Sequence, residues 1–183
     1  PDWRNSGLWV DMSSNLNTLN KKFSKYLDTK LKFEKKKITS KNLDIILEKN
    51  KDFLGDTIDL LSIDLSKNTY HILKNMNFYK PNIIVTEYNA KLRDSIEWVS
   101  EYDENSIWDG TDDFGASLKS FQLMLEYKGY KLVGCNITGI NAFFVRNDLI
   151  NEKFFNNYNS EFHYEPLRSW LIKKFEIEIK QKI

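Results

Sequence analysis

The sequence has 183 residues, of which 41% are hydrophobic and 14% aromatic, so a single compact domain with a sizeable core is expected. Its 27 basic and 26 acidic side chains nearly cancel, which argues against nucleic acid or an anionic membrane as a partner. No apolar run is long enough to span a bilayer, no secretory leader is recognisable, and the single cysteine, Cys135, suits a reducing compartment. We therefore expect a cytoplasmic protein.

The first third of the chain predicts two strands and two helices. GLWVD, residues 7–11, is a short apolar strand that ends in Asp11. Apolar residues at helical spacing follow over residues 16–27. A weak strand around Phe33 and an amphipathic helix over residues 43–47 come next.

The middle of the chain predicts two further strands that end in polar side chains. DLLSID is a buried-strand pattern that ends in Asp64, and NIIVTEYN is a strand that carries Glu87 and Asn89 at its end. A helix over residues 70–76 joins them. Strands that alternate with helices in this way predict a parallel sheet.

A loop of roughly 25 residues follows, long enough to suggest a function. It contains Trp98, Tyr102 and Trp108. Because planar rings and sugars lie well on aromatic faces, these three side chains can form a substrate-binding wall, and they can equally pin the loop to the domain.

The last part of the chain predicts a helix over residues 117–127, which Gly129 ends, and then a hairpin. KLVGCN and NAFFVR form this antiparallel hairpin, because only residues 137–140 separate them. We expect residues 1–160 to form the α/β domain and residues 161–183 to form a helix packed on its outside. The predicted fold is a mostly parallel, Rossmann-like sheet with a C-terminal antiparallel hairpin.

Three acidic residues stand at the carboxyl ends of predicted strands, where parallel sheets bind ligands: Asp11, Asp64 and Glu87. A carboxylate at the end of an early strand can accept both hydroxyl groups of a ribose. Asp64 and Glu87 can share a divalent cation with Asn89, or one of them can act as a general base. The alternative is that each carboxylate only caps a helix or solvates a loop.

Other reactive side chains favour structural roles. His71 lies inside a predicted helix, and His163 stands in a tyrosine- and proline-containing segment, so packing or exposure to solvent explains both. Cys135 ends a predicted strand without a partner histidine, which favours a place in the core.

Several strings, in this order and spacing, resemble an uncharacterised bacterial group within the FkbM-like, S-adenosylmethionine-dependent methyltransferases. They are DLLSID followed by Tyr70, then IIVTEYNA, GASL, KGYKLVGCN and NAFFVRNDL, and the resemblance runs over residues 3–149. It implies a class I methyltransferase sheet, S-adenosylmethionine as cofactor, and O-methylation of a glycan or small hydroxylated acceptor.

The resemblance also assigns residues. Such enzymes hold the cofactor at a glycine-rich turn after strand 1 and at an acidic residue that ends strand 2. GLWVD resembles strand 2, which makes Asp11 the ribose ligand. DLLSID resembles strand 4 and TEYN the end of strand 5, so that Asp64, Glu87 and Asn89 line the cleft, with the two carboxylates as the catalytic residues.

The chain departs from the group after Asp64. Where the group continues with an aspartate, a glycine, a further residue and another aspartate, this chain has Ser66, Lys67, Asn68 and Thr69. We expect Lys67 to weaken any metal site there, because it repels a cation and competes for the Asp64 carboxylate.

The chain also lacks a glycine-rich turn. VDMSSN can be interpreted as a worn strand 1 motif, but too few residues lie between Asp11 and Asp59 to hold two more strands. We therefore assign GLWVD to strand 2. In the family fold, strand 1 lies between strands 2 and 4, so the sheet is expected to be incomplete at its N-terminus. A longer polypeptide, another chain or a rearranged sheet then fills the place.

These observations leave two functions open. The first is a methyltransferase domain that is incomplete or degraded in this chain and acts on a small molecule or glycan. The alternative is a non-catalytic interaction module that keeps the sheet and binds a partner through the aromatic loop.

Overall fold

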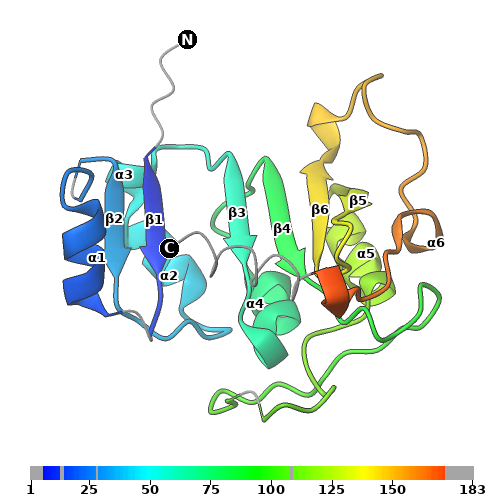
Figure 1. The fold of residues 1–183 in the computed structure, drawn as a ribbon. Coiled ribbons are helices and arrows are strands. Elements are labelled where there is room, and N and C mark those ends of the chain that lie inside the picture. The colour runs from blue at the N-terminus through cyan, green and yellow to red at the C-terminus, as the bar shows by residue number, and fades with distance from the viewer. Residues whose placement is uncertain (1–5, 13–14, 28, 108, 172–183) are drawn as a thin grey trace.

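The computed structural model describes residues 6–12, 15–27, 29–107 and 109–171. Helices flank two neighbouring β-sheets, one of two strands and one of four (Figure 1). The expected α/β class is thereby confirmed, with one parallel two-stranded sheet and one mixed sheet. Within the described residues, every helix is too short or too polar to cross a membrane.

The small sheet pairs β1 (Gly7–Val10) with β2 (Leu31–Glu34) in parallel. Helix α1 (Leu16–Phe23) connects them and begins at Asn15, whose side chain accepts the backbone N–H groups of the first turn. The Trp9 ring meets the rings of Phe23 and Phe33 edge-on, at centroid distances of 6.3 and 6.2 Å. These ring contacts attach α1 to one face of the small sheet.

The large sheet has the order β3 (Leu60–Ile63), β4 (Ile83–Glu87), β6 (Asn141–Arg146) and β5 (Tyr130–Cys135). β3 and β4 are parallel, whereas β6 is antiparallel to both β4 and β5. The predicted hairpin is confirmed, with β5 at the edge. Ile84, Phe144 and Leu132 are register partners on three neighbouring strands and are all buried, so this row forms the floor of the core.

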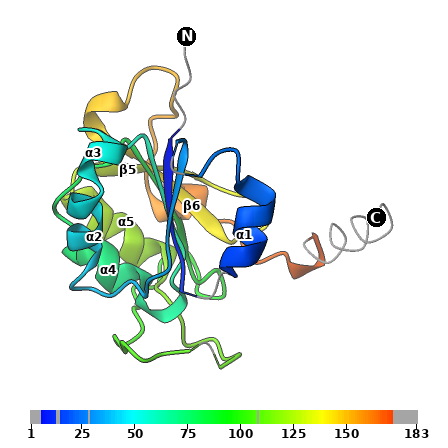
Figure 2. The ribbon, with the colours of Figure 1, turned by 90° about the vertical axis from the view of Figure 1, so that its left-hand side faces the viewer.

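Most helices cover a single face of the large sheet. Helices α2 (Leu43–Lys49), α3 (Lys51–Leu54), α4 (Thr69–Asn75) and α5 (Leu118–Tyr127) lie on the side opposite α1 (Figure 2). Short 3-10 turns, η1 (Ser66–Asn68) and η2 (Asn147–Leu149), follow β3 and β6. The core lies between the sheet and the α4–α5 layer, because the apolar side chains of both layers are buried there.

β1 and β3 are neighbours in space but do not pair. Both strands run in the same direction, and in Figure 1 they lie beside each other as the inner edges of their sheets. Among the residues that the structure describes, β1 pairs only with β2, and β3 only with β4. The facing edges of the GLWVD and DLLSID strands are therefore unpaired in the described part of the chain, whereas a missing strand between them stays a prediction.

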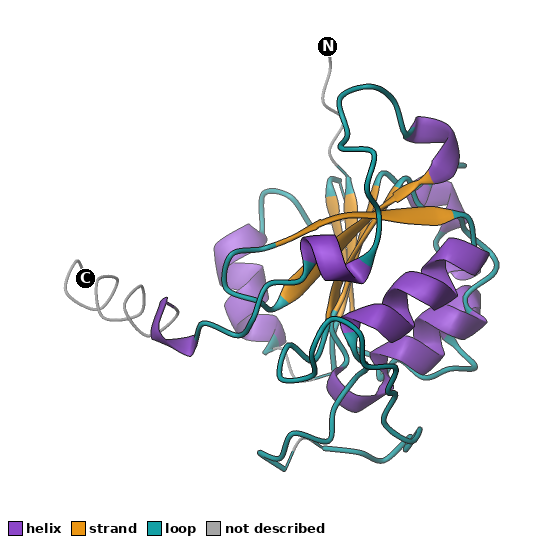
Figure 3. Ribbon diagram, turned by 90° about the vertical axis from the view of Figure 1, so that its right-hand side faces the viewer, coloured by secondary structure: helices purple, strands orange, loops and turns teal. Residues whose placement is uncertain are grey.

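The C-terminal segment differs from the prediction of one helix over residues 161–183. Helix α6 (Ser160–His163) is a single turn, and residues 164–168 are not helical. Pro166 is the reason, since a proline disfavours helical backbone at the residue before it. The described tail instead crosses the sheet edge to the face opposite α4 and α5 (Figure 3). Residues 172–183 lie outside the described part.

Side-chain hydrogen bonds fix the tail after α6. The Tyr164 hydroxyl donates to the Ala90 carbonyl at 2.6 Å, and the Tyr88 hydroxyl donates to the Glu165 carbonyl at 2.5 Å. The Arg168 backbone N–H donates to the Thr138 carbonyl in the β5–β6 turn. These bonds hold the tail over the ends of β4 and β6.

Candidate functional site

Asp64 and Glu87 come together at the carboxyl ends of two parallel strands. The register pairs Ile63 with Thr86, so the next residues on the two strands, Asp64 and Glu87, stand side by side. Burial, the charge of Asp64 and a side-chain hydrogen bond with it, in that order of importance, together raise the pKa of Glu87 to about 7. The pair thus holds a proton near neutral pH, as a general acid or base requires.

Local backbone geometry presents Asp64 to solvent. After β3 the chain turns at Ser66, which has a left-handed φ of 49°, and enters η1. The Ser66 N–H lies 3.5 Å from the Asp64 carboxylate. Asp64 is exposed whereas Glu87 is half-buried, so Glu87 is the more shielded partner and Asp64 is the one that solvent or a ligand reaches first.

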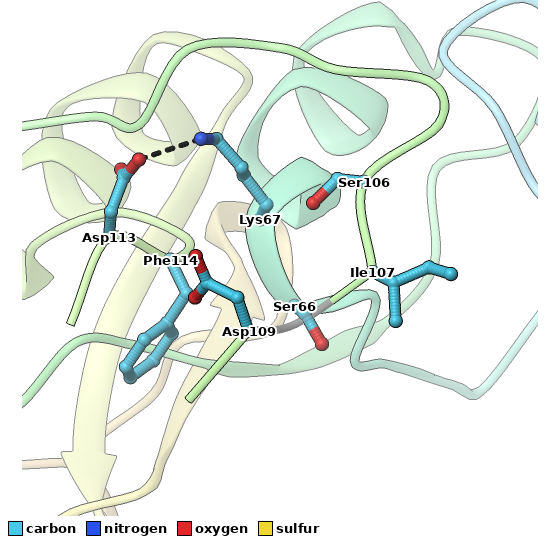
Figure 4. Close-up of a pocket in the computed structure, with 7 residues that line it drawn as sticks. All are labelled: Ser66, Lys67, Ser106, Ile107, Asp109, Asp113 and Phe114. Carbon is cyan, nitrogen blue, oxygen red and sulfur yellow. Dashed lines mark hydrogen bonds and ion pairs between the residues drawn. The ribbon is translucent and has the colours of Figure 1, made fainter. Parts of the chain in front are cut away.

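Lys67 does not pair with Asp64, contrary to the expectation from the sequence. Its ammonium group lies 2.7 Å from the Asp113 carboxylate, which belongs to the long loop, and this hydrogen bond raises the pKa of Lys67 (Figure 4). Asp103 and Asp109 add weaker attraction. The cation is therefore held by the loop, and Asp64 keeps Glu87 as its acidic neighbour.

Lys67 and Asp113 are part of a small pocket between η1 and the long loop. Its volume is about 40 Å³, and seven residues line it (Figure 4): Ser66, Lys67, Ser106, Ile107, Asp109, Asp113 and Phe114. A cavity of this size holds a water molecule or two, whereas a drug-sized ligand needs several hundred Å³. Sequence reasoning did not single this pocket out, because its two walls lie more than thirty residues apart along the chain.

Asn89 is buried and anchors the long loop. Its amide nitrogen donates to the carbonyl oxygens of Asp112, at 2.8 Å, and Phe114, at 3.3 Å. Its amide oxygen accepts the Lys91 backbone N–H. The structure thus brings Asp64 and Glu87 together, while the Asn89 side chain is engaged with the loop; a role for it in binding metal or substrate stays a prediction.

The aromatic side chains of the loop are attached to different helices. Tyr102 lies against the His71 ring of α4, with a centroid distance of 5.6 Å, and its hydroxyl accepts the Ser40 N–H. Trp98 is half-buried, and its backbone N–H donates to Ser117 and Ser120 at the start of α5. Trp108 lies outside the described residues.

The histidines and the cysteine have structural surroundings. His71 Nε2 lies 2.8 Å from the Ser100 carbonyl, which can only accept, so this nitrogen carries a proton and ties α4 to the loop. His163 Nε2 bonds the Asn157 carbonyl in the same way, and burial lowers its pKa. Burial raises the pKa of Cys135 to about 12, which keeps it a neutral thiol.

Asp11 stands at the carboxyl end of β1. The edge of β1 that faces β3, the strand that Asp64 follows, is not paired with it. Its backbone N–H donates to Glu34 on β2 at 3.1 Å, which continues the small sheet by one residue. Strands β1, β3 and β4 all end at the same side of the molecule (Figure 1). Asp11, Asp64 and Glu87 are therefore on one rim, and the unpaired edges of β1 and β3 separate Asp11 from the two other carboxylates.

Comparison of the chain with protein-family models, with curated proteins and with solved structures finds no match in any of the three.

Proposed function

We propose that this chain is the larger part of an FkbM-like, S-adenosylmethionine-dependent O-methyltransferase domain whose cofactor strand is missing from it. The observation that carries the proposal is the unpaired place between β1 and β3. It lies between the strands that resemble strands 2 and 4 of the family, which is where that family has strand 1. The carboxylates that the resemblance assigns to the site stand on the rim beside it.

Glu87 is the proposed general base. With a pKa raised to about 7 by burial and by Asp64, it can take the proton of an acceptor hydroxyl near neutral pH. Asp64, which is more exposed, adds to this proton affinity and can orient the acceptor. The bound cofactor supplies the electrophilic methyl group.

The described residues fit only part of a cofactor site. Asp11 can accept a ribose hydroxyl, a charge-assisted bond worth roughly 1.5–3 kcal/mol at most. Micromolar binding takes about 8 kcal/mol. Asp11 alone cannot supply this free energy, and the glycine-rich turn that supplies the rest in the family is not in the sequence. The proposal is therefore that the chain becomes competent only with an added strand and turn.

Methyl transfer tests the proposal. The polypeptide extended upstream is incubated with S-adenosylmethionine carrying a labelled methyl group and a panel of sugars, glycans and small hydroxylated acceptors. We expect label in an acceptor, a rate that rises through about pH 7 as Glu87 ionises, and a loss of about 10²-fold or more in Glu87→Gln. Transfer that Glu87→Gln leaves unchanged would remove Glu87 from the mechanism, and the absence of transfer to any acceptor would count against the enzyme.

A non-catalytic interaction module is the second candidate function. The observation in its favour is Ile107 in the long loop, whose side chain is 87% exposed. The upstream coding sequence separates the two candidates. A glycine-rich strand and turn there supports the enzyme, whereas a native start codon directly before this chain supports the module.

A further inference from the structure

Asn141 lies beside Glu87, on the neighbouring strand β6. The register pairs the two residues, and at the next pair along the strands the Tyr88 N–H donates to the Ile140 carbonyl at 2.9 Å. Hydrogen-bonded and non-hydrogen-bonded pairs alternate along an antiparallel ladder, so Glu87 and Asn141 form a non-hydrogen-bonded pair. Side chains are closest in such pairs, with Cβ atoms about 4.5–5.5 Å apart. The Asn141 amide can therefore reach a ligand group that is bound at the Glu87 carboxyl.

The side chains of Asn141 and Glu87 lie on the same face of the large sheet. Thr86 precedes Glu87, Ala142 follows Asn141, and both of these neighbours are fully buried on the side of the core. Successive side chains along a strand alternate between the two faces. Asn141 and Glu87 therefore both point to the face opposite α4 and α5, where each is half-buried at the rim.

The β5–β6 turn fixes the backbone of Asn141. Its N–H donates to the Asn136 side-chain oxygen at 3.0 Å, and its carbonyl accepts the Asn136 backbone N–H at 2.9 Å. The same Asn136 side-chain oxygen also accepts the Ile140 N–H at 2.9 Å. Asn136 thus holds the first residue of β6 at a set distance from the end of β4, as a preorganised hydrogen-bond donor requires.

The Asn141 side chain has no hydrogen-bond partner among the residues that the structure describes. Asn89 and Asn136, by contrast, use their side chains to bond the long loop and the β5–β6 turn. A side-chain amide has two N–H donors and an acceptor oxygen. The Asn141 amide therefore has donors to offer to a ligand, next to a carboxyl group that can take up a proton.

We propose that the Asn141 side chain donates a hydrogen bond to the acceptor oxygen that Glu87 deprotonates. The inference rests on the proposed function and adds a catalytic residue to it. The hydroxyl proton passes to Glu87, the oxygen forms a bond to the methyl carbon, and the electron pair of the broken bond stays on the cofactor's sulfur. Negative charge develops on the oxygen as the proton leaves, and the amide N–H stabilises that charge.

Two substitutions test this role in the methyl-transfer assay. Asn141→Ala removes the donor, and we expect kcat/KM to fall at least about tenfold with an unchanged pH dependence. Asn141→Asp keeps the size of the side chain but puts a carboxylate beside Glu87, in addition to Asp64, the charged side chain that already acts on it. Its loss should be larger, and the midpoint of its pH–rate profile should rise. Asn75→Ala, exposed on α4, is the control and should leave the rate unchanged.

A titration without cofactor tests the position of Asn141 by itself. The Glu87 carboxyl is followed by NMR in the 183-residue chain. In Asn141→Asp the midpoint of its titration should rise by at least about half a pH unit, because a like charge then stands next to it. Asn75→Asp adds the same charge on α4 and should leave that midpoint in place.

Three results would overturn the inference. An unchanged Glu87 midpoint in Asn141→Asp would mean that the two side chains are not neighbours. Methyl transfer that Asn141→Ala leaves unchanged would retain the proposed function and reject the role of Asn141. The absence of transfer to any acceptor would reject the proposed function and this role together, even where the titration confirms the position of Asn141.

Discussion

Glu87 is the residue whose ionisation has the clearest consequence for stability. Its pKa is about 7 in the folded chain against an ordinary value of 4.5, with burial as the main cause and Asp64 as the second. Between these two pH values the folded chain binds more protons than the unfolded chain. The contribution of protonated Glu87 to the free energy of unfolding is therefore fully present below pH 4.5 and is lost as the pH rises through 7.

Replacing Glu87 by glutamine should remove this pH dependence, because glutamine resembles the protonated acid. Relative to the unsubstituted chain, Glu87→Gln should gain stability between pH 5 and pH 8, by at most about 3 kcal/mol and less after solvent screening. Urea unfolding at both pH values measures the difference. The exposed Glu152→Gln serves as the control. Parallel pH profiles for Glu87→Gln and the unsubstituted chain would contradict the buried carboxyl pair.

At the same scale, the sequence predicted the position of each carboxylate better than its partners. Asp64 and Glu87 were recognisable because each ends an apolar strand, and parallel strands end on one rim. The partner of Lys67 was not recognisable in the sequence. Asp113 lies 46 residues away along the chain and reaches Lys67 only through the fold of the loop. The hydrogen-bond partners of Asn89 were not predictable for the same reason, since its acceptors, Asp112 and Phe114, are also in that loop.

At the scale of elements, the β5–β6 turn is the clearest packing constraint. Gly139 has a φ of +69°, and a Cβ placed there would lie 2.2 Å from the Pro166 carbonyl oxygen. The turn and the tail therefore fit together only if residue 139 has no side chain. The short connection in the sequence was enough to predict the hairpin, but the tail against it was not predictable, because the contact joins residues distant in sequence.

Gly139→Ala should therefore lower the free energy of unfolding by more than the strain of a positive φ alone would. Gly110→Ala is the matched control, since Gly110 also has a positive φ, +85°, but nothing lies within 4 Å of its Cβ position. We expect the free energy of unfolding, measured in urea, to fall by about 1 kcal/mol in Gly110→Ala. In Gly139→Ala we expect a further loss of roughly 1–3 kcal/mol. Equal losses in both variants would mean that the tail does not press on the turn.

The tail illustrates what periodicity alone misses. Apolar residues after position 161 suggested one long helix, but Pro166 stops helical backbone, and the hydrogen bonds of Tyr164 and Glu165 then fix an extended path over β4 and β6. A proline is visible in the sequence; the tyrosines that bind the extended segment become visible only in the fold.

At the scale of the whole molecule, strands β1, β3 and β4 end on the same side, and the facing edges of β1 and β3 do not pair. The described residues leave the facing edges of β1 and β3 unpaired, as the resemblance and the spacing of the strands predict, and a strand between them stays a prediction. The segment that would lie between β1 and β3 could not be predicted, because the sequence has no recognisable counterpart of strand 1 of the family. We propose that an upstream strand completes both the sheet and the cofactor site.

Titration calorimetry with S-adenosylmethionine tests this claim most directly. The 183-residue chain should bind no tighter than millimolar, because it offers Asp11 and no glycine-rich turn, and millimolar binding corresponds to about 4 kcal/mol. The polypeptide extended upstream should bind in the micromolar range, and Asp11→Asn should weaken that binding about tenfold or more. Micromolar binding by the short chain would mean that VDMSSN is the cofactor turn, and no binding by the extended polypeptide would contradict the methyltransferase proposal.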